Sequence, residues 1–211
     1  GGGLRGGVIH GVYGGVWGKE HGVIDGHPRT GELMPVMTHL GAAAPSGLAA
    51  IEPETWMPAG VFGPSDRSES SSGETVRPEV LAAACFNLHQ LMRIALVPDG
   101  ASYRTSAEPW VTGESLDFHP TDVVPDADGS LLLVDTGGWY KLCCPTSQFE
   151  RPEVLGGIYR VSPIGAEVPD DPRGLRIDWG AADPNRLAGL LDDDRPFVRE
   201  RAIATLASRG E

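Results

Sequence analysis

The sequence is poor in positive charge and in long apolar runs, and each shortage excludes a class of protein. Its 17 lysines and arginines are outnumbered by 29 aspartates and glutamates, which gives a formal net charge of −12 at pH 7. A protein that binds nucleic acid needs a basic surface to neutralise phosphates, so this balance argues against a nucleic-acid partner. No apolar run approaches the ~18 residues that a membrane-spanning helix needs, so we expect no membrane span in this chain.

Cysteine is scarce as well. The three thiols, Cys85, Cys143 and Cys144, are too few for a disulfide scaffold. No C-x-x-C or C-x-x-C-H motif is present for a zinc ribbon or for attachment of a c-type haem. The adjacent Cys143 and Cys144 can close only a strained ring, so free or packed thiols are the favoured interpretation, with pairing of one of them to Cys85 as an alternative.

Turn residues are abundant, and they separate short apolar segments. The chain has 29 glycines and 18 prolines, a composition typical of turn-rich β proteins. The first forty residues show no helical period and are predicted to form loops with short strands, and residues 63–78 to form a flexible surface insertion. The pattern predicts strands over 45–51, 81–86, 90–97, 130–135 and 157–161, and strands spaced in this way suggest a barrel, a sandwich or a propeller.

The last thirty residues change to a helical pattern. Asp183 followed by Pro184 is a typical helix start, and apolar residues then recur at helical spacing. A second helix is predicted to begin at Pro196 and to end at Gly210. The sequence therefore predicts a helical hairpin over 183–211, joined to the β region by a linker over 167–182 that is rich in proline and aspartate.

Several stretches resemble known repeat proteins. Residues 120–123, 128–131, 134–135 and 157–161 resemble one blade of the NHL-like and soluble sugar-dehydrogenase-like β-propellers, and residues 44–49, 81–86 and 91–94 resemble the preceding blade. Residues 16–20, 25–36 and 137–148 are similar to the planctomycetal membrane-bound dehydrogenase family. In that family a propeller is followed by HEAT repeats and, in many members, by a c-type cytochrome domain.

The resemblance implies a mainly β chain that holds the C-terminal blades of a propeller, followed by a HEAT-type helical hairpin. Residues 1–166 would form about two blades with glycine-rich N-terminal loops, and residues 183–211 the first HEAT repeat. The chain begins without an initiator methionine or a signal region, and a propeller closes only when all its blades are present. We therefore expect a fragment of a periplasmic or cell-surface protein, whose partners include the remaining blades and further repeats.

The function implied by the resemblance is that of a dehydrogenase. Such a protein would oxidise a sugar or an alcohol and pass electrons to a cytochrome domain, with haem c expected in a downstream domain rather than in this chain. The alternatives are a non-catalytic propeller that binds carbohydrate or protein, with the HEAT repeats as a spacer, and a purely structural module. In such propellers the loops at one end form the functional face, and here they carry His39, Asn87, His89, Asp117, Phe118, His119, Trp139, Tyr140 and Lys141.

Two groups of these loop residues suggest a specific chemistry. His119 could act as a general base with Asp117 as its orienting carboxylate, although a histidine that caps the start of a strand is the simpler interpretation. Trp139 and Tyr140 beside the cation Lys141 suit the stacking of a sugar ring or a cofactor. They suit equally a plug that seals the edge of a sheet.

No metal site is predicted. Asp126 and Asp128 begin like a calcium loop, but the bidentate acid position falls on Gly137, so a hairpin turn is favoured. His21, Asp25 and His27 could converge on a metal from one loop, but loop histidines that bond to backbone groups are the favoured interpretation.

Pyrroloquinoline quinone is also disfavoured as a cofactor. Its three carboxylates need cationic partners, which the resembling enzymes supply as one lysine and two arginines. The corresponding positions here are Asn87, His119 and Thr121, so we expect weak binding or none.

Overall fold

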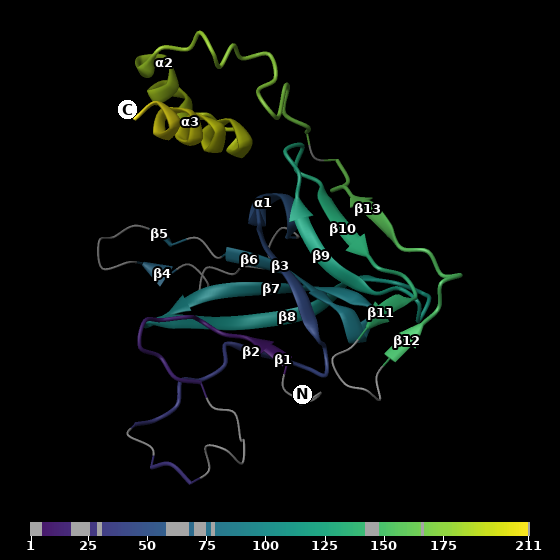
Figure 1. Cartoon of the computed structure of the whole chain (residues 1–211). Coiled ribbons are helices and arrows are strands. Elements are labelled where there is room, and N and C mark those ends of the chain that lie inside the picture. The colour runs from purple at the N-terminus through teal and green to yellow at the C-terminus, as the bar shows by residue number, and fades with distance from the viewer. Residues whose placement is uncertain are drawn as a thin grey trace. The chain divides into compact units, whose positions relative to one another are not determined.

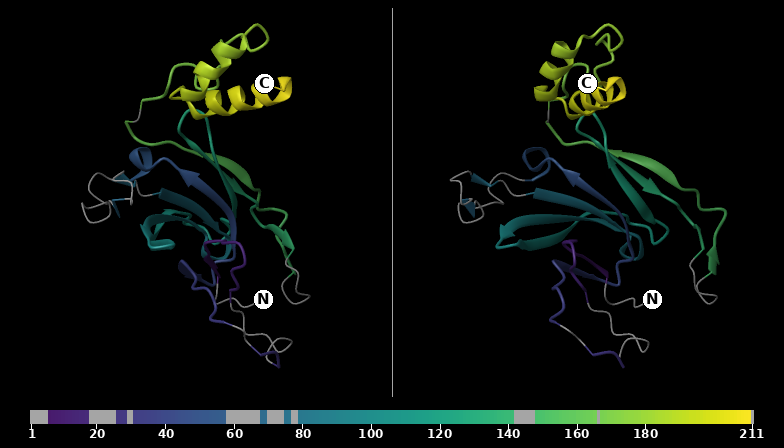
Figure 2. Two further views of the ribbon diagram at one scale, coloured as in Figure 1. Left: turned by 90° about the vertical axis from the view of Figure 1, so that its left-hand side faces the viewer. Right: turned by 60° about the vertical axis from the view of Figure 1, so that its left-hand side comes forward.

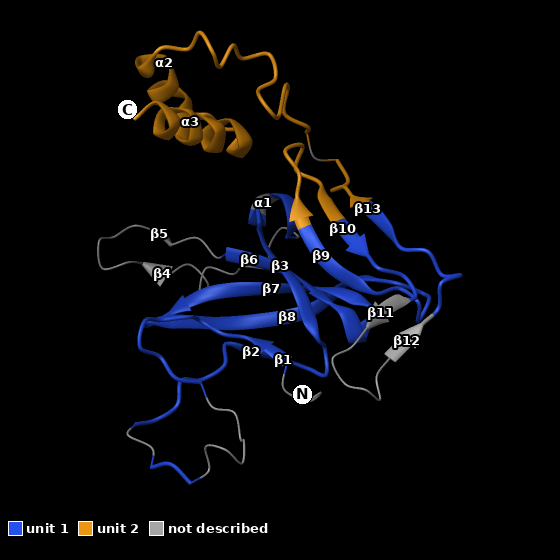
Figure 3. Ribbon diagram, viewed as in Figure 1, with its two compact units in different colours: residues 1–123, 133–159 blue, residues 124–132, 160–211 orange. Residues whose placement is uncertain are grey.

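Strands dominate the computed structural model of the chain, so the mainly β prediction is confirmed (Figure 1). The structure describes residues 6–17, 26–28, 31–57, 68–69, 75–76, 79–141, 148–165 and 167–210. The chain divides into two compact units, coloured separately in Figure 3. Unit 1 comprises residues 1–123 and 133–159, and unit 2 comprises residues 124–132 and 160–211.

A four-stranded antiparallel sheet is the largest element of unit 1. Its strands follow one another in the order β3-β6-β7-β8, and the long strands β7 and β8 twist together (Figure 2). The predicted turn after residue 86 is a 3-10 turn, η2 (Phe86–Leu88), followed by His89 in the left-handed conformation at φ +53°. The strand bounds are β3 (Pro45–Ile51), β6 (Glu79–Cys85), β7 (Gln90–Asp99) and β8 (Ser102–Thr112).

One face of this sheet carries a buried hydrophobic cluster of unit 1. The short strands β1 (Gly6–Val8) and β2 (Thr38–Gly41) pair with each other, and the Thr105 hydroxyl of β8 donates to the Met37 carbonyl at 2.7 Å. The prediction of loops and short strands over the first forty residues is therefore confirmed for the part that the structure describes. The buried cluster consists of Leu40, Ala43, Ala83, Cys85, Met92, Ile94 and Leu96.

The connection from β3 to β6 contains a helix that the sequence analysis did not predict. Helix α1 (Pro53–Trp56) begins with a proline at its first position, and the Arg93 guanidinium donates to the Trp56 carbonyl at 2.6 Å. The predicted insertion, 63–78, contains the hairpin of β4 (Ser68–Glu69) and β5 (Thr75–Val76). The other residues of that insertion lie outside the described part of the chain.

A close contact joins β3 to β9 (Pro120–Pro125), the strand that follows the four-stranded sheet in the chain. The Ser46 hydroxyl donates to the Pro120 carbonyl at 3.3 Å. A Cβ atom added to Gly47 would lie 2.5 Å from the Cα atom of Asp122, so only glycine allows this approach.

The second sheet has the strand order β13-β10-β9 and contains the predicted strands near 130–135 and 157–161. β10 (Leu131–Asp135) alternates buried and half-buried residues, as expected of a strand with one covered face. β13 (Gly157–Val161) forms one edge of this sheet. A further hairpin pairs β11 (Trp139–Lys141) with β12 (Gln148–Glu150).

The turn between β9 and β10 belongs to unit 2 and confirms the hairpin prediction. The Asp126 N–H donates to the Ser130 carbonyl at 2.7 Å, and Gly129 adopts φ +81°. The Asp126 carboxylate, only 6 % exposed, pairs with both Arg160 (2.9 Å) and Arg173. These carboxylate oxygens therefore face guanidinium groups.

Two helices lie in the C-terminal part of unit 2, and the predicted helical pair is confirmed. Asp183 caps α2 (Pro184–Gly189) by accepting the Arg186 N–H at 2.8 Å. A 3-10 turn, η3 (Leu190–Asp192), leads into α3 (Pro196–Arg209), which ends at Gly210 in the left-handed conformation. The residues buried between the helices are Leu187, Val198 and Ala202.

The residues expected to form a linker, 167–182, are part of unit 2 and contact its helices. The Asp171 carboxylate accepts the backbone N–H groups of Leu175 and Arg176, at 2.7 and 3.0 Å. Arg209 of α3 donates to the carbonyls of Ala182 and Trp179, at 2.6 and 2.9 Å. The difference from the expectation arises because Arg173 and Asp171 pair with residues far along the chain, Asp126 and Arg195.

Protonation of the Asp193 carboxylate should lower the stability of unit 2 at acidic pH. A bidentate hydrogen bond from Arg195, at 2.8 Å to each carboxylate oxygen, lowers the pKa of Asp193 to about 2. Because the folded pKa lies below the unfolded one, this stabilisation is complete above about pH 4 and is lost as the pH falls towards 2. We expect Asp193→Asn to lower the melting temperature at pH 6 and to flatten its decrease below pH 4, as followed by circular dichroism at 222 nm.

The matched control is Asp192→Asn, a change to an exposed aspartate on the preceding turn. It should leave both the melting temperature at pH 6 and its acid dependence close to those of the wild type. Parallel pH profiles for Asp193→Asn and the wild type would contradict the prediction.

Candidate functional site

Three loops of unit 1 meet around His119, which directly precedes β9. They are the β6–β7 turn, the β8–β9 connection and the residues after β10. The His119 ring centroid lies 4.7 Å from that of Phe86 and 5.1 Å from that of His89, which is edge-on to it. The structure thus brings together two of the histidines that the sequence analysis placed on the functional face.

His119 is held by backbone groups and is only 5 % exposed. Its Nδ1 atom lies 2.7 Å from the Gly137 carbonyl oxygen and 3.0 Å from that of Asp117. Carbonyl oxygens only accept hydrogen bonds, so Nδ1 carries a proton and Nε2 is the basic nitrogen of the neutral ring. This fixed geometry agrees with the simpler interpretation, a histidine at the start of a strand.

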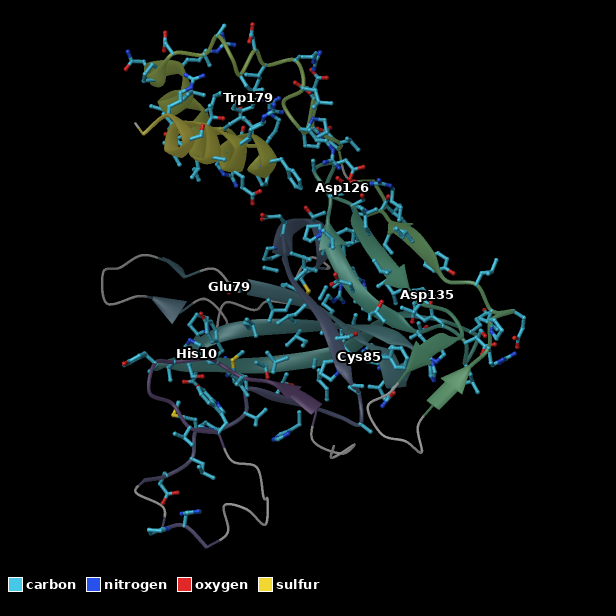
Figure 4. All side chains as sticks on the ribbon, in the orientation of Figure 1. His10, Glu79, Cys85, Asp126, Asp135 and Trp179 are labelled. Carbon is cyan, nitrogen blue, oxygen red and sulfur yellow. The ribbon has the colours of Figure 1, made fainter. Side chains whose placement is uncertain are left out.

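Asp135 at the end of β10 completes the anchor and was not among the predicted site residues. Its Oδ1 atom accepts the backbone N–H of His119 at 2.9 Å and that of Gly137 at 2.8 Å. The residue is buried, at 7 % exposure, and its side chain is labelled in Figure 4. The available signal was an acidic residue at a core-facing position of an apolar strand, where a carboxylate needs donors.

His89 is the more accessible of the two histidines. It is half-buried, and its Nδ1–H donates to the Phe118 carbonyl at 2.8 Å. The same argument about carbonyl acceptors leaves Nε2 as its basic nitrogen. Asn87, two residues earlier, is exposed, and its backbone N–H donates to the Ala43 carbonyl at 3.0 Å.

Asp117 contacts His119 in a different way from the one expected. Its carbonyl oxygen, rather than its carboxylate, faces Nδ1. The carboxylate pairs with Arg151 at 2.5 Å, and Arg151 also pairs with Glu153 at 3.0 Å. The pairing with Arg151 spans 34 residues, and nothing in the local sequence indicates it.

The other predicted site residues lie elsewhere or outside the described part. His39 is an exposed residue of β2, opposite Gly7 in β1. The backbones of Trp139, Tyr140 and Lys141 form β11, but their side chains lie outside the described part of the structure.

The structure describes only part of the candidate metal and thiol groups. Of the three residues considered for a metal, His21 and Asp25 lie outside the described part of the chain. Among all the residues that the structure describes, no group of three or more His, Cys, Asp or Glu side chains could hold a metal ion. Cys85 is a free, buried thiol, and burial raises its pKa to about 11. Cys143 and Cys144 also lie outside the described part.

No family model, curated protein or solved structure matches the chain. Among the described residues, no helix is both long and apolar enough to cross a membrane.

Proposed function

We propose that this chain contributes two neighbouring blades of a β-propeller, and the first repeat of a helical solenoid, to a dehydrogenase that oxidises a sugar or an alcohol. A four-stranded antiparallel sheet has the size of one propeller blade. Its last strand leads into β9, and β9 contacts the first strand of that same sheet through Ser46 and Gly47. First strands of consecutive blades have this relation, because both face the axis of the propeller.

The observation that carries the proposed activity is the convergence of three loops on His89 and His119. Loops on a rigid sheet scaffold are the usual location of binding and catalytic groups. Both rings donate from Nδ1 to carbonyls, so each has Nε2 as its basic nitrogen. Because His89 is the more exposed, we assign it to the substrate, and we assign His119 to positioning.

In this proposal His89 takes the proton of a substrate hydroxyl. Oxidation of an alcohol to a carbonyl removes two electrons and two protons. One proton would move from the hydroxyl to Nε2 of His89, and the carbon would lose a hydride to a two-electron acceptor of the quinone class, which would pass its electrons one at a time to haem. The resemblance to the dehydrogenase family implies that this acceptor belongs to another part of a periplasmic or cell-surface protein.

Pyrroloquinoline quinone does not fit the residues at the corresponding positions. His119 Nδ1 faces two carbonyl oxygens, and the Thr121 hydroxyl donates to the Val134 carbonyl at 3.3 Å. Asn87 carries no charge. The proposal therefore includes no step through this cofactor.

The test is a titration of the full chain with sugars and alcohols, in which the NMR resonances of its histidine rings are monitored. We expect a sugar or an alcohol to shift the His89 ring signals. His89→Gln should weaken binding by about tenfold, which corresponds to one lost hydrogen bond. His39→Gln should have no effect on binding. Addition of a soluble dye acceptor should then give substrate-dependent bleaching that His89→Gln abolishes.

Binding without bleaching would contradict the dehydrogenase and favour the carbohydrate-binding alternative. Unchanged histidine signals with every compound would contradict the site itself.

A further inference from the structure

A groove on unit 2 lies outside the site described above. Its volume is about 410 Å³, within the range of small binding clefts. One side is formed by α3 and the other by the segment that precedes α2. The lining residues are Arg173, Leu175, Phe197, Glu200, Arg201 and Ala204.

Apolar surface and unpaired charge are combined in this groove. Leu175 is 73 % exposed, although it is a large apolar side chain. The Arg201 guanidinium lies over the Trp179 ring at 4.8 Å, which restrains it. Within the described part of the chain, neither Arg201 nor Glu200 has an ion-pair or side-chain hydrogen-bond partner.

The four residues that α3 contributes form a self-complementary set. They occupy positions i, i+3, i+4 and i+7, so they share one face of the helix. In an antiparallel helix pair with its two-fold axis between residues 200 and 201, Glu200 lies opposite Arg201 of the second copy. The same axis places the large Phe197 opposite the small Ala204. Each charge then meets its opposite, and each large side chain meets a small one.

We propose that the groove receives α3 of a second copy of this chain, which gives a two-fold symmetric dimer. An interface of this kind uses the same surface patch on both subunits, so every contact occurs twice. The proposal rests on the charge and size pattern of α3 and is independent of the proposed oxidoreductase function. Because one helix per subunit is a small contact, we expect a weak dimer, with a dissociation constant in the range of about 10 to 100 μM.

Charge exchange at Glu200 and Arg201 provides a test, with sedimentation velocity of the full chain over a range of concentrations as the measurement. Glu200→Arg replaces both attractive pairs with repulsive ones and should weaken the dimer by about tenfold or more. This change leaves the contact between Arg201 and Trp179 intact, so it tests the interface without altering the packing of unit 2. Arg201→Glu should weaken the dimer similarly.

Recovery is the decisive result. The double variant Glu200→Arg/Arg201→Glu, and an equimolar mixture of the two single variants, restore an opposite-charge pair at both contacts and should recover the dimer. Ile203→Glu is the matched control, since Ile203 is 58 % exposed on the same helix but does not line the groove, and it should leave the dimer unchanged.

A wild-type chain that stays monomeric to 1 mM would overturn the proposal. A dimer that Glu200→Arg does not weaken, or one that neither the double variant nor the mixture recovers, would also overturn it.

Discussion

Asp135→Ala is expected to cause one of the largest losses of stability of any single change in unit 1, about 3 kcal/mol or more in the free energy of unfolding. The carboxylate accepts two backbone N–H groups, from His119 and Gly137, at a position where its side chain is buried. A buried hydrogen bond to a charged group contributes roughly 1.5 to 3 kcal/mol, and alanine leaves both donors unsatisfied. Urea unfolding followed by tryptophan fluorescence measures the loss.

Two variants show whether the loss comes from the hydrogen bonds. Asp135→Asn keeps an oxygen that can accept from the same N–H groups but removes the charge, so we expect roughly half the loss. Asp99→Ala removes an exposed carboxylate at the end of β7 and should change stability by less than about 0.5 kcal/mol. If Asp135→Ala and Asp99→Ala gave similar unfolding midpoints, the anchoring role of Asp135 would be wrong.

Gly47→Val is expected to have an effect of similar size, for a steric reason. Even the Cβ atom of alanine would lie 2.5 Å from the Asp122 Cα atom and 2.6 Å from Oδ1 of the same residue. The backbone of β3 or β9 must then move, and valine adds two methyl groups to the clash. Overpacking of this kind costs about 1 to 3 kcal/mol and sometimes more, so we expect about 3 kcal/mol by urea unfolding.

The effect should also reach the histidine site, because β9 begins one residue after His119. We expect Gly47→Val to shift the ring resonances of His119, whereas Gly11→Ala should shift neither these resonances nor the unfolding midpoint. Gly11 has no atom within 4 Å of an added Cβ, so it is the matched control. Wild-type stability in Gly47→Val would show that β3 and β9 are not in close contact.

The elements that the sequence predicted correctly are those with a short-range cause. β10 is a short run of aliphatic residues, and α2 begins with an aspartate cap followed by proline. Each pattern lies within a few consecutive residues, so the local sequence is enough to predict the element.

The contacts of the histidine site that were missed join distant residues. The Asp135 carboxylate and the His119 N–H are 16 residues apart, and Arg151 pairs with Asp117 across 34 residues. The sequence supplied His89 and His119 as separate loop residues, but it could not show that their rings meet. It also could not show that the Asp117 carboxylate has an arginine partner, which removes it from the expected role beside His119.

The boundary between the two units crosses the chain three times, at residues 123–124, 132–133 and 159–160. One consequence concerns any attempt to produce the helical part alone. A polypeptide of residues 160–211 would keep Arg160 and Arg173 but lose the Asp126 carboxylate that neutralises both of them. Both guanidinium groups would then lack the carboxylate that they share in the intact chain, and this loss would lower the stability of the segment. A permuted polypeptide that carries residues 124–132 along with 160–211 restores that counter-charge and is the smallest version of unit 2 that is complete.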